Sequence, residues 1–111
     1  MDERISQYRI MWVLVLFDLP TETKADRKNY AIFRKDLIKD GFLMFQFSIY
    51  IRQCASKENA EVHMKRVKRV LPPTGEVGIF CITDKQFEDI QLFSCKKRKK
   101  VECEDIQLSL F

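Results

Sequence analysis

The chain has 111 residues, which is the usual size of one domain with a single hydrophobic core. It is 46% hydrophobic with only three glycines and three prolines, which excludes disordered, collagen-like and low-complexity chains. Twenty Lys and Arg against 16 Asp and Glu leave a formal net charge of +4, so the chain is mildly basic with dense surface charge of both signs.

The first ten residues contain two acids and two arginines, and no small-residue cleavage site follows them, so we expect no secretory signal peptide. The longest apolar run, residues 10–17, is far shorter than the roughly 20 residues that span a bilayer. These features predict a soluble, cytoplasmic protein.

The four cysteines lack the close spacing of a zinc or redox motif, so we expect free and mostly buried thiols. The single histidine, His63, lies in a helical pattern without a partner histidine. It is expected at the protein surface or at the rim of the core rather than at a metal.

The first predicted element is a strand at residues 10–17, because this continuous apolar run is rich in β-forming residues and ends at Asp18. A helix follows, with Thr23 as its N-cap and Asp26 in the position of a capping box. Gly41 is its expected C-terminal stop. The predicted buried stripe of this helix consists of Tyr30, Phe33, Leu37 and Ile38.

Residues 43–52 alternate between two sets of side chains with the period of a strand, over a stretch long enough to bend into two strands. A second helix is predicted over residues 56–71, before a Pro-Pro pair. Its expected apolar face consists of Ala60, Met64, Val67 and Leu71. Residues 77–83 and 90–95 are predicted as further strands, and the tail alternates again around Ile106, Leu108 and Leu110.

This order of elements predicts an α+β fold, most economically a ferredoxin-like two-layer sandwich in which two helices cover one face of an antiparallel sheet. Residues 10–95 would form this domain. Residues 1–9 would be an N-terminal extension, and residues 96–111 a basic segment followed by a C-terminal edge strand.

The second face of the predicted sheet also needs a cover. The strand at residues 10–17 is apolar on both faces, and Phe80 and Ile82 are apolar opposite Ile79 and Cys81. Because the chain offers no further predicted helix, we expect a second copy of the sheet there, in a two-fold homodimer. The alternating tail offers an edge strand to its own sheet or to the partner's sheet.

Asp18 is the candidate for chemistry, because it is the carboxylate that directly ends the most apolar strand. One interpretation is a turn cap, a role that Asp often fills where a strand breaks. The other uses the dimer: two copies of Asp18 facing each other would form an oxygen site for Mg²⁺ or Mn²⁺, with waters and a substrate phosphate. Such a metal would activate a water and neutralise charge on the phosphoryl group.

Positive charge is concentrated in three stretches: both predicted helices have an excess of basic residues, and residues 96–100 are all Lys or Arg. A charge run is usually a solvated loop, but three such stretches, doubled in a dimer, fit the phosphates of a nucleic-acid duplex. The sequence contains no P-loop, Ser-His-Asp set or HExxH motif. Residues 77–82 contain no Lys or Arg, so the signature of an RNA-recognition module is missing.

Four motifs occur in a specific order. They are VLVLFDLPT at residues 13–21, a helix with Arg27, Lys28, Phe33, Leu37 and Gly41, QFSIY at residues 46–50, and ITDKQF at residues 82–87. Over roughly residues 10–95 this pattern resembles the family of CRISPR-associated protein two, the small subunit of the spacer-acquisition complex. The details are most similar to versions that accompany single-effector (type II) systems.

The resemblance implies a ferredoxin-fold homodimer with stacked sheets, and it places the family's metal-binding and catalytic aspartate at Asp18, with Mg²⁺ or Mn²⁺ shared between two copies. Family members are described as Mg²⁺-dependent endoribonucleases, some of which cut double-stranded DNA. In the adaptation complex the dimer bridges two dimers of the CRISPR integrase and holds the prespacer duplex. The implied partners are therefore the integrase and double-stranded DNA, with single-stranded RNA as a further candidate.

The candidates for nucleic-acid contact are Arg27, Lys28 and Arg52, followed by Lys97, Arg98 and Lys99 of the cationic block. The family's C-terminal strands contact the integrase, which here corresponds to Ile106, Leu108 and Leu110. Three functions stay open: a metal-dependent nuclease, a structural DNA-binding subunit without catalysis, and a toxin-like metal-dependent mRNA interferase.

Overall fold

The computed structural model describes residues 9–95, which form a four-stranded sheet, two long helices and one short helix. The strands are β1 (Met11–Asp18), β2 (Leu43–Gln46), β3 (Ile49–Cys54) and β4 (Glu76–Thr83). The helices are α2 (Lys24–Lys39), α3 (Lys57–Arg69) and α4 (Asp84–Glu88). The strand order is β2-β3-β1-β4, and all neighbouring strands are antiparallel. The predicted α+β, ferredoxin-like arrangement of two helices and one antiparallel sheet is confirmed.

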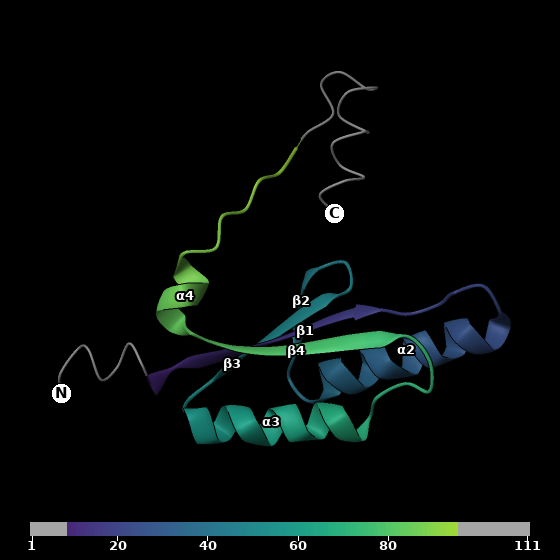
Figure 1. The fold of residues 1–111 in the computed structure, drawn as a ribbon, viewed down its shortest axis with the longest axis horizontal. Helices are drawn as coiled ribbons and strands as arrows, with labels where there is room; N and C mark the ends of the chain where they lie inside the picture. Colours follow the sequence, from purple (N-terminus) through teal and green to yellow (C-terminus); the bar gives the residue numbers. More distant parts are fainter. Residues whose placement is uncertain (1–8, 96–111) are drawn as a thin grey trace.

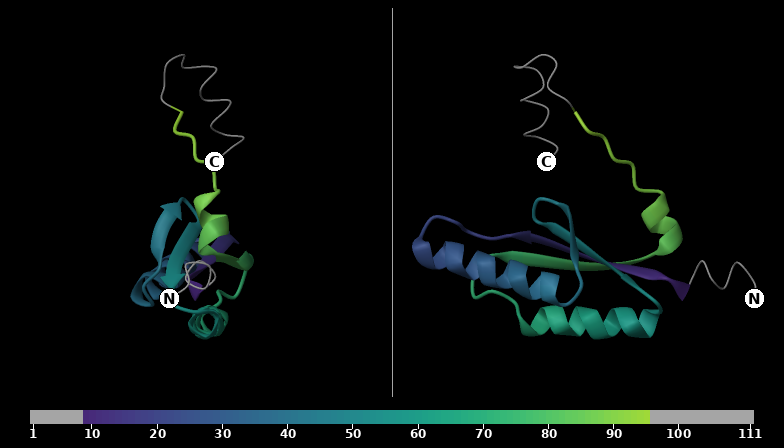
Figure 2. Two further views of the ribbon diagram at one scale, coloured as in Figure 1. Left: turned by 90° about the vertical axis from the view of Figure 1, so that its left-hand side faces the viewer. Right: turned by 180° about the vertical axis from the view of Figure 1, so that it is seen from behind.

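The sheet has one covered face and one largely open face. Figure 1 shows α2 and α3 on one side of the sheet and α4 on the other, and Figure 2 shows these layers from the end and from behind. The core lies between the sheet and the two long helices, because the period of two in a strand sends every second residue of β1 toward them. Its largest fully buried side chains are Tyr50, Phe33, Phe42, Leu37, Val13, Val15, Val67 and Cys54.

The alternating stretch at residues 43–52 bends into two strands, β2 and β3. The turn lies at Phe47 and Ser48, and Ser48 has a φ of 68°, which is uncommon for a residue with a side chain. The backbone N–H of Phe17 donates to the carbonyl oxygen of Ser48 over 3.1 Å. This hydrogen bond fixes the hairpin beside the end of β1.

Each of the two long helices begins at an N-cap residue that can be recognised in the sequence. Thr23 and Asp26 form the predicted capping box, and Ser56 caps α3 by accepting from the backbone N–H of Asn59. Phe33 and Leu37 are buried as predicted, but Ile38 is 47% exposed. The prediction for Ile38 is wrong because it follows Leu37 by one residue, about 100° further around the helix. None of the helices described in residues 9–95 is long and apolar enough to cross a membrane.

The predicted surface position of His63 is wrong: its side chain is only 5% exposed. The residue lies on the inner face of α3, where Ala60 and Val67 are also buried. Its ring Nδ1 donates to Oδ2 of Asp40, at the end of α2, over 2.8 Å. A carboxylate partner from another helix satisfies the imidazole, so the ring can be buried.

Among the cysteines, Cys54 is a buried free thiol and Cys81 a half-buried free thiol, as predicted. Burial raises the pKa of both thiols above the ordinary value. Cys103 lies outside the described residues. The two thiols are therefore core-forming groups rather than reactive ones.

The strand predicted at residues 90–95 is wrong, because these residues have no strand structure. Thr83 ends β4 and forms a capping box with Gln86, which starts α4 at the next residue. Helix α4 turns the chain onto the open face, where Phe87 stacks on Trp12 with ring centroids 3.9 Å apart. The indole Nε1 of Trp12 also donates to Oδ1 of Asp84 over 2.7 Å.

Candidate functional site

Asp18 is the last residue of β1 and is exposed at the end of the sheet. Its direct partner in the antiparallel register is Glu76, the first residue of β4. Both residues line a cavity of about 550 Å³, together with Gln46 and Ser48 from the β2–β3 hairpin and apolar residues of three strands. The structure therefore places a second carboxylate beside Asp18, which the sequence analysis did not identify.

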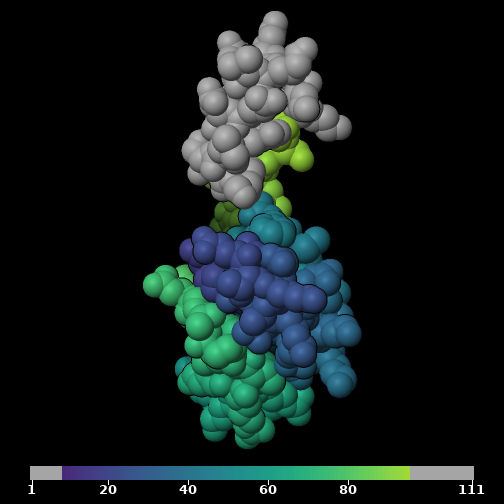
Figure 3. Space-filling view, turned by 90° about the vertical axis from the view of Figure 1, so that its right-hand side faces the viewer, coloured from purple at the N-terminus to yellow at the C-terminus, as the bar shows by residue number. Residues whose placement is uncertain are grey.

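The turn before β4 fixes this arrangement. Gly75 has a φ of +97°, and a Cβ built there would lie 2.9 Å from the carbonyl oxygen of Asp18 and 2.6 Å from a side-chain methyl group of Leu19. Glycine is therefore required for the close approach of the two segments. Figure 3 looks at this end of the molecule, where the purple-blue segment after β1 lies directly against the green turn before β4.

The carboxylates of Asp18 and Glu76 make no hydrogen bond or ion pair with any other residue in the described part of the chain. The turn-cap interpretation of Asp18 thus lacks the hydrogen bond that it needs. None of the residues lining the cavity is basic, so the negative charge there is not neutralised by the described protein.

This donor set fits a hard cation. Mg²⁺ prefers oxygen ligands and is usually bound by one or two carboxylates together with waters and phosphate oxygens. Within residues 9–95, no group of three or more His, Cys, Asp and Glu side chains is placed to hold a metal ion. A cation at Asp18 would therefore complete its shell with water, substrate phosphate or oxygens of a second chain.

Arg27 and Lys28, two of the predicted nucleic-acid contacts, are exposed in the first part of α2. The Arg27 guanidinium donates from one nitrogen to the carbonyl oxygens of Thr21 and Glu22, over 3.1 and 3.0 Å. Arg27 therefore stabilises the loop that follows Asp18, while its other nitrogens remain at the surface. Lys28 forms no hydrogen bond or ion pair with another side chain in residues 9–95.

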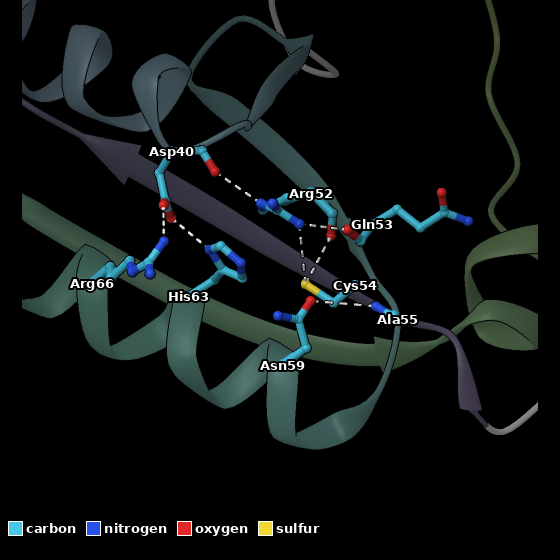
Figure 4. Close-up of polar contacts among 8 residues, drawn as sticks. All are labelled: Asp40, Arg52, Gln53, Cys54, Ala55, Asn59, His63 and Arg66. Atoms are coloured by element: carbon cyan, nitrogen blue, oxygen red, sulfur yellow. Dashed lines mark hydrogen bonds and ion pairs between the residues drawn. The ribbon is translucent and has the colours of Figure 1, made fainter.

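Arg52, the third candidate, lies on β3 opposite Val13, five positions along β1 from Asp18. Its Nε donates to the carbonyl oxygen of Asp40 over 2.8 Å, and a second nitrogen donates to the carbonyl oxygen of Gln53 (Figure 4). The structure thus separates Arg52 from the Asp18 cavity and places it at the C-terminal end of α2. Lys97, Arg98, Lys99, Ile106, Leu108 and Leu110 lie outside the described residues.

A second hollow, of about 340 Å³, lies between the C-terminal halves of α2 and α3. Its charged lining residues are Asp36, Lys39, Asp40, Arg66 and Arg69. Arg66 donates to Asp40 over 2.9 Å, next to the His63 contact. Burial alone would raise the pKa of Asp40, but the hydrogen bonds from His63 and Arg66 lower it below the ordinary value. Lys39 and Arg69 are exposed basic groups that the sequence analysis did not single out.

Residues 11–90 match the family model described as CRISPR associated protein Cas2. The chain is 56% identical over 108 residues to the CRISPR-associated endoribonuclease Cas2 of Flavobacterium psychrophilum, covering 97% of this chain and 94% of the relative. It is 54% identical over 101 residues to the protein of the same name from Parvibaculum lavamentivorans, covering 91% of this chain and all of the relative.

The fold is similar to that of a solved structure described as a crystal structure of cas2, with a TM-score of 0.54 and 21% sequence identity. The similarity covers 82% of this chain and 92% of the solved one, which supports the fold. The family model spans most of the chain, and the relatives match almost over their full length. The chain belongs to the Cas2 family of CRISPR-associated proteins.

Proposed function

We propose that this chain is an adaptation subunit of a CRISPR system, of type II, with metal-dependent endonuclease activity at Asp18. The observation that carries the nuclease is an exposed carboxylate that has no partner among residues 9–95 and is fixed at the end of a rigid strand. The name endoribonuclease, borne by relatives that match this chain almost end to end, supports the same activity.

The proposed reaction is hydrolysis of a phosphodiester bond. Asp18 would hold Mg²⁺ or Mn²⁺, which supplies an activated water and neutralises charge on the phosphoryl group when it is bound. The protein's own contribution is to restrict the position of the Asp18 carboxylate. The Phe17–Ser48 backbone hydrogen bond and the packing of Gly75 against Asp18 restrict the backbone on both sides of this residue.

A homodimer through the open face fits the distribution of apolar side chains. Helix α4 covers the end of this face near Trp12, where Phe87 also lies 5.9 Å from Phe45, measured between ring centroids. Between Trp12 and Asp18 the face stays uncovered, and Phe80, which pairs with Leu14 in the middle of β1, is 54% exposed. A second copy that buries this remaining area would stack on the half of the sheet that contains Asp18, and would bring the two copies of Asp18 together at a shared metal.

The proposed duplex-binding surface is the helical layer. Exposed basic residues lie along both long helices, among them Lys28, Lys39 and Arg69. Phosphate contacts of this kind position a duplex without reading its sequence, which suits a subunit that must hold prespacers of any sequence. We propose that the integrase dimers contact the C-terminal segment around Ile106, Leu108 and Leu110.

The nuclease is tested with the purified chain, labelled single-stranded RNA and double-stranded DNA in a series of Mg²⁺ and Mn²⁺ concentrations. Cleavage by the wild type that is lost in Asp18→Asn, while Lys85→Ala on the exposed side of α4 cleaves normally, supports the proposal. Cleavage that Asp18→Asn retains would contradict it. A wild-type protein that binds duplex DNA and cuts neither substrate would instead identify a structural subunit.

A further inference from the structure

We propose that Glu76 is the second carboxylate of the metal site at Asp18. This inference deepens the proposed function and rests on it. It assigns a role to a residue that neither the motif pattern nor the sequence analysis identified. It also gives each chain two carboxylate groups at the site, where Asp18 alone is a sparse ligand.

The geometry of the proposed two-carboxylate site follows from the register of the β1–β4 pair. Asp18 and Glu76 are direct partners in the β1–β4 pair. Directly opposed residues of antiparallel strands project to the same face, with Cβ atoms about 4.5–5.5 Å apart. Side chains at that separation can place oxygens around one cation, directly or through a metal-bound water. The close packing of Gly75 against Asp18 holds this register at its last pair.

The electrostatics of the pair also favour a cation. Two like charges directly opposite each other on a sheet destabilise it. Elsewhere on the chain, Asp40 is compensated by His63 and Arg66, whereas Asp18 and Glu76 have no such partner among the described residues. The cavity that they share is lined by the neutral oxygen donors Gln46 and Ser48 and by no Lys or Arg. A divalent cation would remove the repulsion.

The experiment measures metal binding rather than cleavage. Mn²⁺ is titrated into the purified full chain, and free Mn²⁺ is followed by electron paramagnetic resonance, for the wild type, Asp18→Asn, Glu76→Gln and Glu61→Gln. Glu61 is an exposed carboxylate on α3, on the other side of the sheet, and serves as the matched control. We expect Glu76→Gln to weaken Mn²⁺ binding at least tenfold, in the range typical of residues that support a metal site, and Glu61→Gln to leave it unchanged.

Thermal unfolding gives a second readout, because Glu76→Gln should change Tm differently without and with divalent metal. Without divalent metal, Glu76→Gln should raise Tm slightly, because it removes the repulsion. With Mg²⁺ in excess, the wild-type Tm should rise by linkage, and the rise should be smaller in Glu76→Gln. Glu61→Gln should keep the full rise.

The outcomes separate this inference from the proposed function. If Asp18→Asn abolishes Mn²⁺ binding and Glu76→Gln binds like the wild type, the role of Glu76 is overturned and the Asp18 site stands. If the wild type does not bind Mn²⁺, or if neither variant changes its binding, both this inference and the metal-dependent nuclease at Asp18 are overturned.

Discussion

His63 Nδ1 lies 2.8 Å from Oδ2 of Asp40, and this contact joins the middle of α3 to the end of α2. Arg66, one turn further along α3, donates to the other oxygen of the same carboxylate. One aspartate thus connects the two helices of the layer, and the backbone of the same residue accepts from Arg52 of the sheet (Figure 4). Replacement of His63 by Ala should therefore lower the free energy of unfolding by about 1–3 kcal/mol, because a buried hydrogen bond is lost.

Urea unfolding measures this loss, with Lys35→Ala on the exposed side of α2 as the control. A His63→Ala protein as stable as the wild type would show that the contact is not needed to hold the helices together.

The lowered pKa of the Asp40 carboxylate predicts how the free energy of unfolding depends on pH. The pKa of Asp40 is lower in the folded chain than the ordinary value of 3.8, so its contribution is fully present above that value and is lost as the pH falls through the lower, folded pKa. Asp40→Asn should be less stable than the wild type at neutral pH, and the difference should shrink below about pH 4. Urea unfolding at a series of pH values tests this, and a constant difference down to pH 2 would contradict it.

Gly75 should tolerate substitution poorly. Gly75→Ala requires a residue with a side chain at a φ of +97° and brings Cβ within 2.9 Å of the Asp18 carbonyl oxygen, so it should cost about 1–3 kcal/mol of stability. Gly78 is the matched control, because its nearest neighbour to a built Cβ is 3.5 Å away and its φ is not positive. Chemical unfolding of the two variants gives the comparison, and equal stabilities would contradict the requirement for glycine at position 75.

Phe80 tests the homodimer. Phe80→Glu introduces a charge into the uncovered middle of the open face, and it should weaken self-association at least tenfold. Light scattering after gel filtration should give twice the chain mass of 13.3 kDa for the wild type and a single chain mass for the variant. Ile32→Glu is the control, since Ile32 is also about half exposed but lies on α2. A wild-type monomer, or a dimer that survives Phe80→Glu, would rule out association through this face.

Lys39 and Arg69 test the duplex-binding surface. Each substitution by Ala should weaken duplex binding irrespective of DNA sequence and should reduce the slope of log K against log salt by about 0.9 for each phosphate contact removed. Lys85→Ala, on α4 at the other side of the sheet, serves as the comparison and should leave the slope unchanged. A salt slope that neither Lys39→Ala nor Arg69→Ala alters would place the duplex on another surface.

The features that the sequence predicted correctly depend on residues close together in the chain. Thr23 and Asp26 form their capping box within one helical turn. The sequence left open whether residues 43–52 bend, and the structure divides them into β2 and β3. The features that it missed depend on distant partners. The pairing of Asp18 with Glu76 is set by a register across 58 positions, and His63 is buried because Asp40 meets it from another helix. Residues 90–95 resemble a strand locally, but the capping box at Thr83 directs the chain into α4 first.

The position of α4 determines from which side of the sheet residues 90–95 depart. Figure 1 shows residues 90–95 leading away on the side opposite to α2 and α3. Residues 90–95 therefore leave the surface of α2 and α3 free, so a ligand bound to the helical layer would not meet this segment.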